Sequence, residues 1–281
     1  GSDDVFFDSN SGSGTVTLSN YPLCQNINCT GFTGTLTGTA VEWRIYGNIV
    51  LSSTMTCTVS TLIYASASGL STITSNGKTL TTSDFWLSFS VNNVQLTDAF
   101  VIGGTLRLER GTFNANNQNV TVKNLYTQYT NTRTLTMGSG TWTITEGWNT
   151  STTTNLTFNK DTATIVLDAA SGSVSSPRSF QGGGLTFNKL VVNGTIAQTS
   201  FTGNNTFSEL SRTTVGAHTL LFASSTTTTV GSWTASGSSG NVLTIQSDTV
   251  GTAATLALSS GYVTGVNYLT IKDVIGSPIS D

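Results

Sequence analysis

Hydrophobic and polar residues alternate along much of the chain. In Val41-Glu42-Trp43-Arg44-Ile45-Tyr46, Val, Trp and Ile fall on one face and Glu, Arg and Tyr on the other, and Leu106-Arg107-Leu108-Glu109 repeats the scheme. A period of two places successive side chains on opposite faces of a β-strand. The same alternation recurs in Val120-Thr121-Val122, Trp142-Thr143-Ile144, Leu156-Thr157-Phe158 and Leu269-Thr270-Ile271. The pattern predicts many short strands with one apolar face each.

Groups of Gly, Asn and Ser separate these strands, as at 138–140, 182–184 and 237–240. Such residues tolerate positive φ and form turns. No segment has a sustained helical period, and the strong helix formers are sparse. The chain is therefore expected to be all-β, either as an antiparallel β-sandwich or as a β-solenoid of stacked coils.

Recurring sequence segments favour the solenoid. Residues 156–160, 185–189 and 242–245 resemble one another at intervals of roughly 20 to 35 residues, the range of stacked repeats. Asn-Gly hairpin signals are confined to Asn76-Gly77 and Asn193-Gly194. We predict a single elongated domain, a right-handed parallel β-helix. Its N-terminal coils would span 3–102 and its repeat region 103–281, with the antiparallel sandwich as the alternative.

Composition narrows the classes of function. Roughly a third of the 281 residues are Ser or Thr, and 9% are charged, against about 25% in typical soluble domains. The 11 Lys and Arg are mostly scattered, whereas nucleic-acid binding depends on clustered cations. No apolar run approaches the roughly 18 residues of a membrane span. We expect no nucleic-acid partner and no membrane span.

Several Thr- and Gly-rich phrases resemble a known class of protein. They occupy 111–116, 131–142, 163–167, 180–185, 240–247 and 268–273. Together they resemble the Thr/Gly-rich β-helical repeat regions of bacteriophage virion and tail proteins and of related bacterial surface proteins. The resemblance covers about residues 103 to 275.

That resemblance implies a structural or host-contacting segment of an appendage, located on a virion or an extracellular surface. Its partner would be a host surface glycan or another virion subunit, and a homotrimer is one assembly open to such a chain. The resemblance brings no catalytic motif with it. Residues 1–2 are expected to be a cloning remnant, and the chain is expected to be a piece of a longer polypeptide.

Aromatic residues in polar surroundings are the candidates for carbohydrate binding, since their rings can stack on sugar rings. Tyr126 and Tyr129 lie in a polar stretch, and Trp148 follows a glycine in another. We expect these three side chains to be exposed; the alternative is that they cover strand ends. Trp43 and Trp142 have the parity of inward residues and are expected in the core.

A polysaccharide lyase or hydrolase is the alternative function, because such enzymes are also built on β-helices. It would need paired carboxylates on one outer face. Glu42 and Glu109 come nearest, and alternation places both outward with Arg44 and Arg107. Ion pairs on a solvated face are the simpler interpretation. His218 has no nucleophile motif to serve, so no catalytic residue is assigned.

Three cysteines, Cys24, Cys29 and Cys57, complete the candidate chemistry. Cys24 and Cys29 flank a short polar loop and could form a disulfide in an oxidising setting; the alternative is three unbonded thiols. Together with the single His218 they give no familiar zinc spacing. No metal site and no cofactor are expected.

An ice-binding or carbohydrate-binding solenoid is a third function class. It requires threonine ladders on one flat face of the coils. The run Thr226 to Thr229 breaks strict alternation, so no regular ladder is expected.

Overall fold

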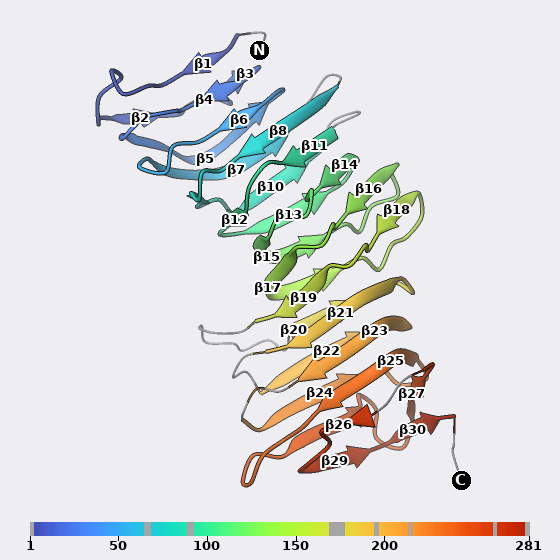
Figure 1. Ribbon diagram of the computed structural model, residues 1–281. Coiled ribbons are helices and arrows are strands. Elements are labelled where there is room, and N and C mark those ends of the chain that lie inside the picture. The colour runs from blue at the N-terminus through green and yellow to red at the C-terminus, as the bar shows by residue number, and fades with distance from the viewer. Residues whose placement is uncertain are drawn as a thin grey trace. The chain divides into compact units, whose positions relative to one another are not determined.

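The protein is described by a computed structural model that covers residues 3–64, 69–88, 93–168, 178–193, 197–212, 214, 216–260 and 263–278, with the side chains of 39–41 and 63–64 left out. The described residues form strands β1 to β30 and no helix (Figure 1). Within them, therefore, no helix is long or apolar enough to cross a membrane. The all-β prediction is confirmed.

The chain divides into two compact units, Gly1–Trp142 with Thr152–Asp161 and Thr143–Ser151 with Thr162–Asp281. The strands of unit 1 are β1 (Val5–Phe6), β2 (Thr15–Thr17), β3 (Leu23–Cys24), β4 (Ile27–Asn28), β5 (Thr35–Ile45), β6 (Ile49–Val50), β7 (Thr56–Tyr64), β8 (Leu70–Thr74), β9 (Thr79–Leu80), β10 (Asp84–Leu87), β11 (Asn93–Leu96), β12 (Phe100–Ile102), β13 (Thr105–Leu108), β14 (Gly111–Asn114), β15 (Val120–Tyr126), β16 (Arg133–Thr136) and β18 (Leu156–Asn159). β17 (Thr141–Asn149) begins in unit 1 and continues in unit 2. The other strands of unit 2 are β19 (Thr164–Leu167), β20 (Arg178–Gln181), β21 (Thr186–Val192), β22 (Gln198–Thr202), β23 (Asn205–Arg212), β24 (His218–Phe222), β25 (Thr227–Ala235), β26 (Leu243–Ser247), β27 (Ala254–Leu258), β28 (Val263–Thr264), β29 (Leu269–Lys272) and β30 (Val274–Ser277).

In unit 1 the strands pair with strands of the next coil rather than with their sequence neighbours. β9, β10 and β11 pair in parallel with β12, β13 and β14, respectively, which come one coil later in the chain. Unit 2 follows the same rule, since β20 pairs with β22 and β21 with β23, again in parallel. These ladders define a parallel β-solenoid. The alternative of an antiparallel sandwich is wrong, because antiparallel pairing among the described residues is confined to two isolated bridges.

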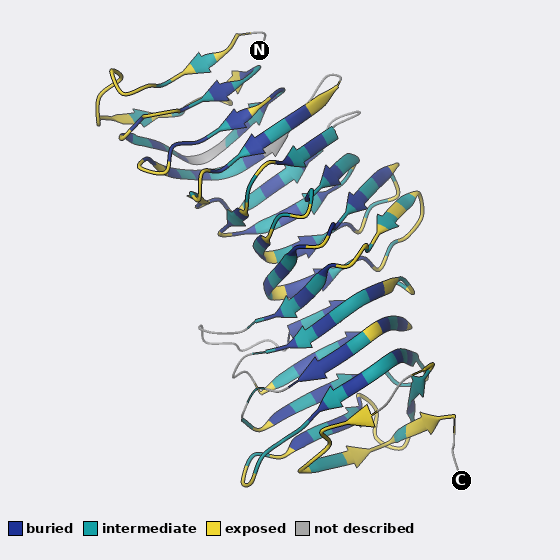
Figure 2. Ribbon diagram, in the orientation of Figure 1, coloured by how far each residue is buried: buried dark blue, intermediate teal, exposed yellow. Residues whose placement is uncertain are grey.

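Alternation along each strand separates core from surface, as Figure 2 shows. Trp43, Ile45, Trp142 and Ile144 are all buried, as their parity predicts; the side chain of Val41 lies outside the described ones. In unit 2 the inward positions stack aromatic rings in register. Trp148 packs parallel to Phe180, with ring centroids 5.8 Å apart, and the stack continues through in-register residues of the following strands, Phe201 and Phe222.

Asparagine side chains join consecutive coils at a corner of unit 1. The Asn26 backbone N–H donates to Asp4 Oδ1 at 3.2 Å, and the Asn48 N–H donates to Asn26 Oδ1 at 2.6 Å. The Thr72 N–H then donates to Asn48 Oδ1 at 2.8 Å. Each of these contacts spans 22 to 24 residues, which is one coil. The Asp4 carboxylate and the two asparagine amides thus accept hydrogen bonds from backbone donors at the turn.

Candidate functional site

A polar and aromatic cluster lies on the outer face of unit 1 over β10, β13 and β15. In the register of these parallel strands, Trp86 is opposite Arg107 and Arg107 is opposite Tyr126. Their sequence neighbours Phe85, Leu106 and Leu125 are buried, so alternation directs the Trp, Arg and Tyr side chains outward. Because the strands are adjacent, residues far apart in the chain form one row.

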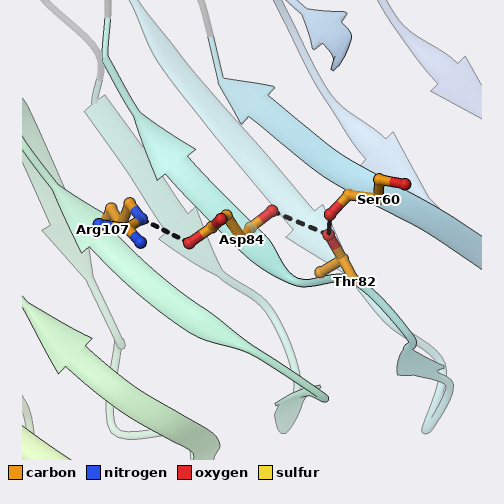
Figure 3. Close-up of polar contacts among 4 residues, drawn as sticks. All are labelled: Ser60, Thr82, Asp84 and Arg107. Atoms are coloured by element: carbon orange, nitrogen blue, oxygen red, sulfur yellow. Dashed lines mark hydrogen bonds and ion pairs between the residues drawn. The ribbon is translucent and has the colours of Figure 1, made fainter. Parts of the chain in front are cut away.

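Arg107 is the centre of this cluster. Its Nε donates to Asp84 Oδ1 on the neighbouring strand, as Figure 3 shows. The guanidinium carbon lies 5.4 Å from the centroid of the Tyr126 ring, a cation–π distance. Partial burial opposes the charge on Arg107, but the hydrogen bond and charge of Asp84, with a further hydrogen bond to Tyr129, raise its pKa. The guanidinium is therefore held charged and fixed against a ring.

Asp84 is itself held at the start of β10. The buried Thr82 hydroxyl donates to the Asp84 carbonyl oxygen at 2.8 Å and lies 3.1 Å from the Ser60 carbonyl oxygen (Figure 3). These contacts connect the backbone of Asp84 to the preceding coil. They position Asp84 before any ligand arrives.

Tyr126 and Tyr129 form an edge-to-face pair with centroids 5.6 Å apart and planes at 82°. Both rings are half-buried, and the Tyr126 hydroxyl donates to Gln128 Oε1 at 2.7 Å. Burial raises the pKa of Tyr129, although its hydrogen bond to Arg107 acts in the opposite direction. The structure thus brings together two of the three predicted carbohydrate-binding residues.

A buried arginine fixes the loop 127–132 that carries Tyr129. Arg133 is 1% exposed, and its Nη2 donates to the Thr127 carbonyl at 2.8 Å. Nη1 donates to the carbonyls of Asn131 at 3.1 Å and Thr154 at 2.8 Å. Burial lowers the pKa of Arg133. Sequence reasoning missed this residue, although Arg133 shares the parity of the buried Leu135, a signal that an arginine points inward.

A polar groove of about 380 Å³ lies next to this loop. Hydroxyl, amide and guanidinium groups line it, from Asn93, Arg110, Gly111, Thr112, Asn131, Thr132, Arg133 and Thr134. Glu109 borders the groove, accepting from Arg110 Nε at 3.5 Å and from Asn131 Nδ2 at 3.4 Å. We call the groove together with Asp84, Arg107, Tyr126 and Tyr129 the corner site.

Trp148, the third predicted carbohydrate-binding residue, is not at the corner site. It belongs to unit 2 and is fully buried between Phe180 and Phe187. Its Nε1 donates to Thr150 Oγ1 at 3.1 Å. The expectation that Trp148 is exposed is therefore wrong. Alternation breaks just before it, with Glu146 exposed and Gly147 and Trp148 both buried, and the ring is covered by the aromatic residues of the neighbouring strands.

Glu42 and Glu109 do not form an acid pair. Pairing of β5 with β7, β7 with β10 and β10 with β13 puts three strand spacings between Glu42 and the strand that precedes Glu109. That separation is about 14 Å, beyond the roughly 5–9.5 Å of glycosidase carboxyl pairs. Glu42 instead pairs with Arg44 at 3.0 Å. The simpler interpretation, in which these carboxylates form ion pairs on the surface, fits this geometry.

His218 also lies inside the fold. It is 3% exposed, and its Nε2 is 3.1 Å from Thr199 Oγ1. Among the residues that the structure describes, no three His, Cys, Asp or Glu side chains are grouped so that they could hold a metal ion.

Cys24 and Cys29 are free thiols, so the proposed disulfide is absent and the alternative of unbonded cysteines is correct. Both are buried together with Cys57. Burial raises the pKa of Cys24 to about 11, of Cys29 to about 12 and of Cys57 to about 11. The neutral thiol is the form that suits the core.

These pKa values predict loss of stability at high pH. A thiol whose pKa is raised by folding stabilises the protein fully below its ordinary value of 9.0, and this contribution is lost as the pH rises through about 11 to 12. The urea midpoint should fall across that window, and less steeply in Cys29→Ala. Thiol reagents should modify the folded protein far more slowly than the urea-unfolded chain. Equal rates of modification would contradict the burial of the three thiols.

Comparison with known proteins gives no relative: no family model, no curated protein and no solved structure matches the chain.

Proposed function

We propose that this protein is a non-enzymatic structural and adhesive segment of a virion or cell-surface appendage, and that it contacts a glycan through the corner site. The observation that carries the proposal is the Tyr126–Tyr129 pair beside the Arg107–Asp84 ion pair, next to a groove lined by hydroxyl and amide groups. The parallel solenoid supports the mechanical part. Its stacked coils each bury the face of the next.

The chemistry of the corner site suits a saccharide. Aromatic rings pack on the apolar face of a sugar ring, while planar carboxylate, amide and guanidinium groups exchange hydrogen bonds with its hydroxyls. Asp84 and Arg107 neutralise each other, so the site offers donors and acceptors without a large net field. The anchors Thr82 and Arg133 hold these groups in place, which lowers the entropic cost of binding.

Binding to a panel of immobilised bacterial and algal glycans tests the proposal. For the glycan that binds best, we expect Tyr126→Ala with Tyr129→Ala to weaken binding by about tenfold or more, equivalent to about 1.4 kcal/mol. Tyr21→Ala is the matched control, because Tyr21 is 62% exposed in the same unit and lies outside the corner site. The adhesive function would be overturned if the protein bound none of the glycans, or if the double variant bound as tightly as the unmodified chain.

A reducing-end assay with the same glycans tests the non-enzymatic part. No turnover is expected, because the carboxylates Glu42 and Glu109 are too far apart to act together. Turnover that disappears in Glu109→Gln would show instead that the protein is a carbohydrate-active enzyme.

A further inference from the structure

Four strands of unit 1 carry the same triplet, a threonine on each side of an inward residue. The triplets begin β2, β5 and β7 and include β9 with the residue after it. We call their eight outward residues the threonine array: Thr15, Thr17, Thr35, Thr37, Thr56, Thr58, Thr79 and Thr81.

The strands of the array pair in parallel and in exact register. Thr15 is opposite Thr35 and Thr17 is opposite Thr37 in the β2–β5 ladder. In the β5–β7 ladder, Thr35 is opposite Thr56 and Thr37 is opposite Thr58. A bridge then joins Thr58 to Thr81, which places Thr56 opposite Thr79. The register irregularity of β5 comes after the array, between Gly38 and Glu42.

The middle residue of each triplet fixes the direction of its two threonines. Leu36, Cys57 and Leu80 are at most 2% exposed, and Val16 is half-buried at the end of the row. Because these side chains point inward, the flanking threonines point outward, where all eight are exposed or half-buried. A β-branched side chain in a strand also has few rotamers. Methyl and hydroxyl groups are therefore repeated with the same orientation.

Within the part of the chain that the structure describes, none of the eight hydroxyls forms a hydrogen bond with the protein. Several other threonines of unit 1 differ from the array, because their hydroxyls do have protein partners. The Thr74 and Thr97 hydroxyls are 2.7 Å apart, and the Thr82 hydroxyl binds carbonyl oxygens. The array thus presents a set of free donors and acceptors that folding does not use.

The array is a two-dimensional lattice. Neighbouring strands lie about 4.8 Å apart, and residues two positions apart in a strand are about 6.7 Å apart. Both distances are close to repeats of the hexagonal ice lattice. Water molecules that hydrogen-bond to hydroxyls held at these spacings would take up the same repeat.

From this geometry we infer that the threonine array is an ice-binding face. A binding site for a soluble glycan usually contains aromatic rings and planar polar groups, which the array lacks. A binding site for a protein partner usually has an apolar centre. A crystal of water is the ligand that repeats in two directions with hydroxyl chemistry. The expectation of no regular threonine ladder is thereby corrected. Burial also alternates within the run at 226–229, since Thr228 is buried whereas Thr227 and Thr229 are half-buried.

Thermal hysteresis and partitioning into growing ice test the inference. The unmodified chain should show both, and Thr37→Tyr with Thr58→Tyr should abolish them, because two rings would protrude from the centre of the array. Tyrosine suits strands, so the fold should survive. The matched control is Thr206→Tyr with Thr229→Tyr, an outward pair on adjacent strands of unit 2, which should keep the activity.

The two functions fail separately in these assays. Tyr126→Ala should leave ice partitioning intact, and Thr37→Tyr with Thr58→Tyr should leave glycan binding intact. Absence of hysteresis in the unmodified chain, or its persistence in the array variant, would overturn the ice-binding inference. So would binding through the array to crystalline cellulose or chitin without binding to ice.

Discussion

Replacing Trp148 with alanine is expected to lower the free energy of unfolding by about 3–5 kcal/mol. The side chain is fully buried, stacks on Phe180 and meets Phe187 edge to face. Its removal leaves a cavity between two coils of unit 2, and it leaves Thr150 without the indole donor. In a solenoid each coil contacts only its neighbours, so rings on the adjacent strands have little means of closing the gap. Urea unfolding monitored by circular dichroism measures the effect.

Two further variants show whether this loss comes from burial. Trp148→Phe keeps a ring in the stack and removes only the indole donor, so its loss should be clearly smaller. Trp86→Ala deletes the same side chain from the outer face of unit 1, where Trp86 is half-buried, and should also cost less. If Trp148→Ala unfolded at the same urea concentration as Trp86→Ala, the packing described for unit 2 would be wrong.

Arg133→Met is expected to cost about 3 kcal/mol, because one buried and two partly buried carbonyl oxygens lose their donor. Met fills a similar volume without donors, and the carbonyls of Thr127, Asn131 and Thr154 are then unpaired. In a buried ion pair both side chains can be replaced together. Arg133 instead donates to backbone carbonyl oxygens, which remain after any substitution of the arginine. The variant should also bind glycan more weakly, since the loop that positions Tyr129 is no longer held.

Arg110→Met is the matched control, because the neighbouring Arg110 side chain is 47% exposed and pairs with Glu109 at the surface. Exposed pairs contribute about 0–1 kcal/mol. We expect its thermal unfolding midpoint to stay near that of the unmodified chain while that of Arg133→Met falls. Equal midpoints would mean that the hydrogen bonds of Arg133 do not stabilise the coil corner.

Alternation in the sequence predicted the direction of most side chains correctly. It placed Trp43 and Trp142 in the core and Arg107 on the surface, because a strand turns successive side chains to opposite faces whatever its partners. The same rule would have placed Arg133 inside, since it shares the parity of Leu135. Trp148 was misjudged because the alternation breaks before it, where Glu146 is exposed and both Gly147 and Trp148 are buried. Polar sequence neighbours are therefore a poor guide to whether a single position is buried.

Contacts between coils were beyond the reach of the sequence. Cys24 and Cys29 lie close in the chain, yet the structure buries each as a free thiol. Arg107 meets Asp84 and Tyr126 only because β10, β13 and β15 are adjacent in one register. Because the sequence repeat is degenerate, it does not determine how many residues make up each coil. It therefore does not predict which residues lie opposite one another on neighbouring strands.

By itself, then, the amino-acid sequence determined an all-β chain of short strands with a defined inner and outer face, and it favoured the solenoid. Only the tertiary structure decided which outer residues become neighbours, and thereby created the corner site and the threonine array. The physical reason is that the side-chain direction depends on the local backbone of one strand, whereas lateral spacing depends on the register between strands about 20 residues apart, which packing of the whole core selects.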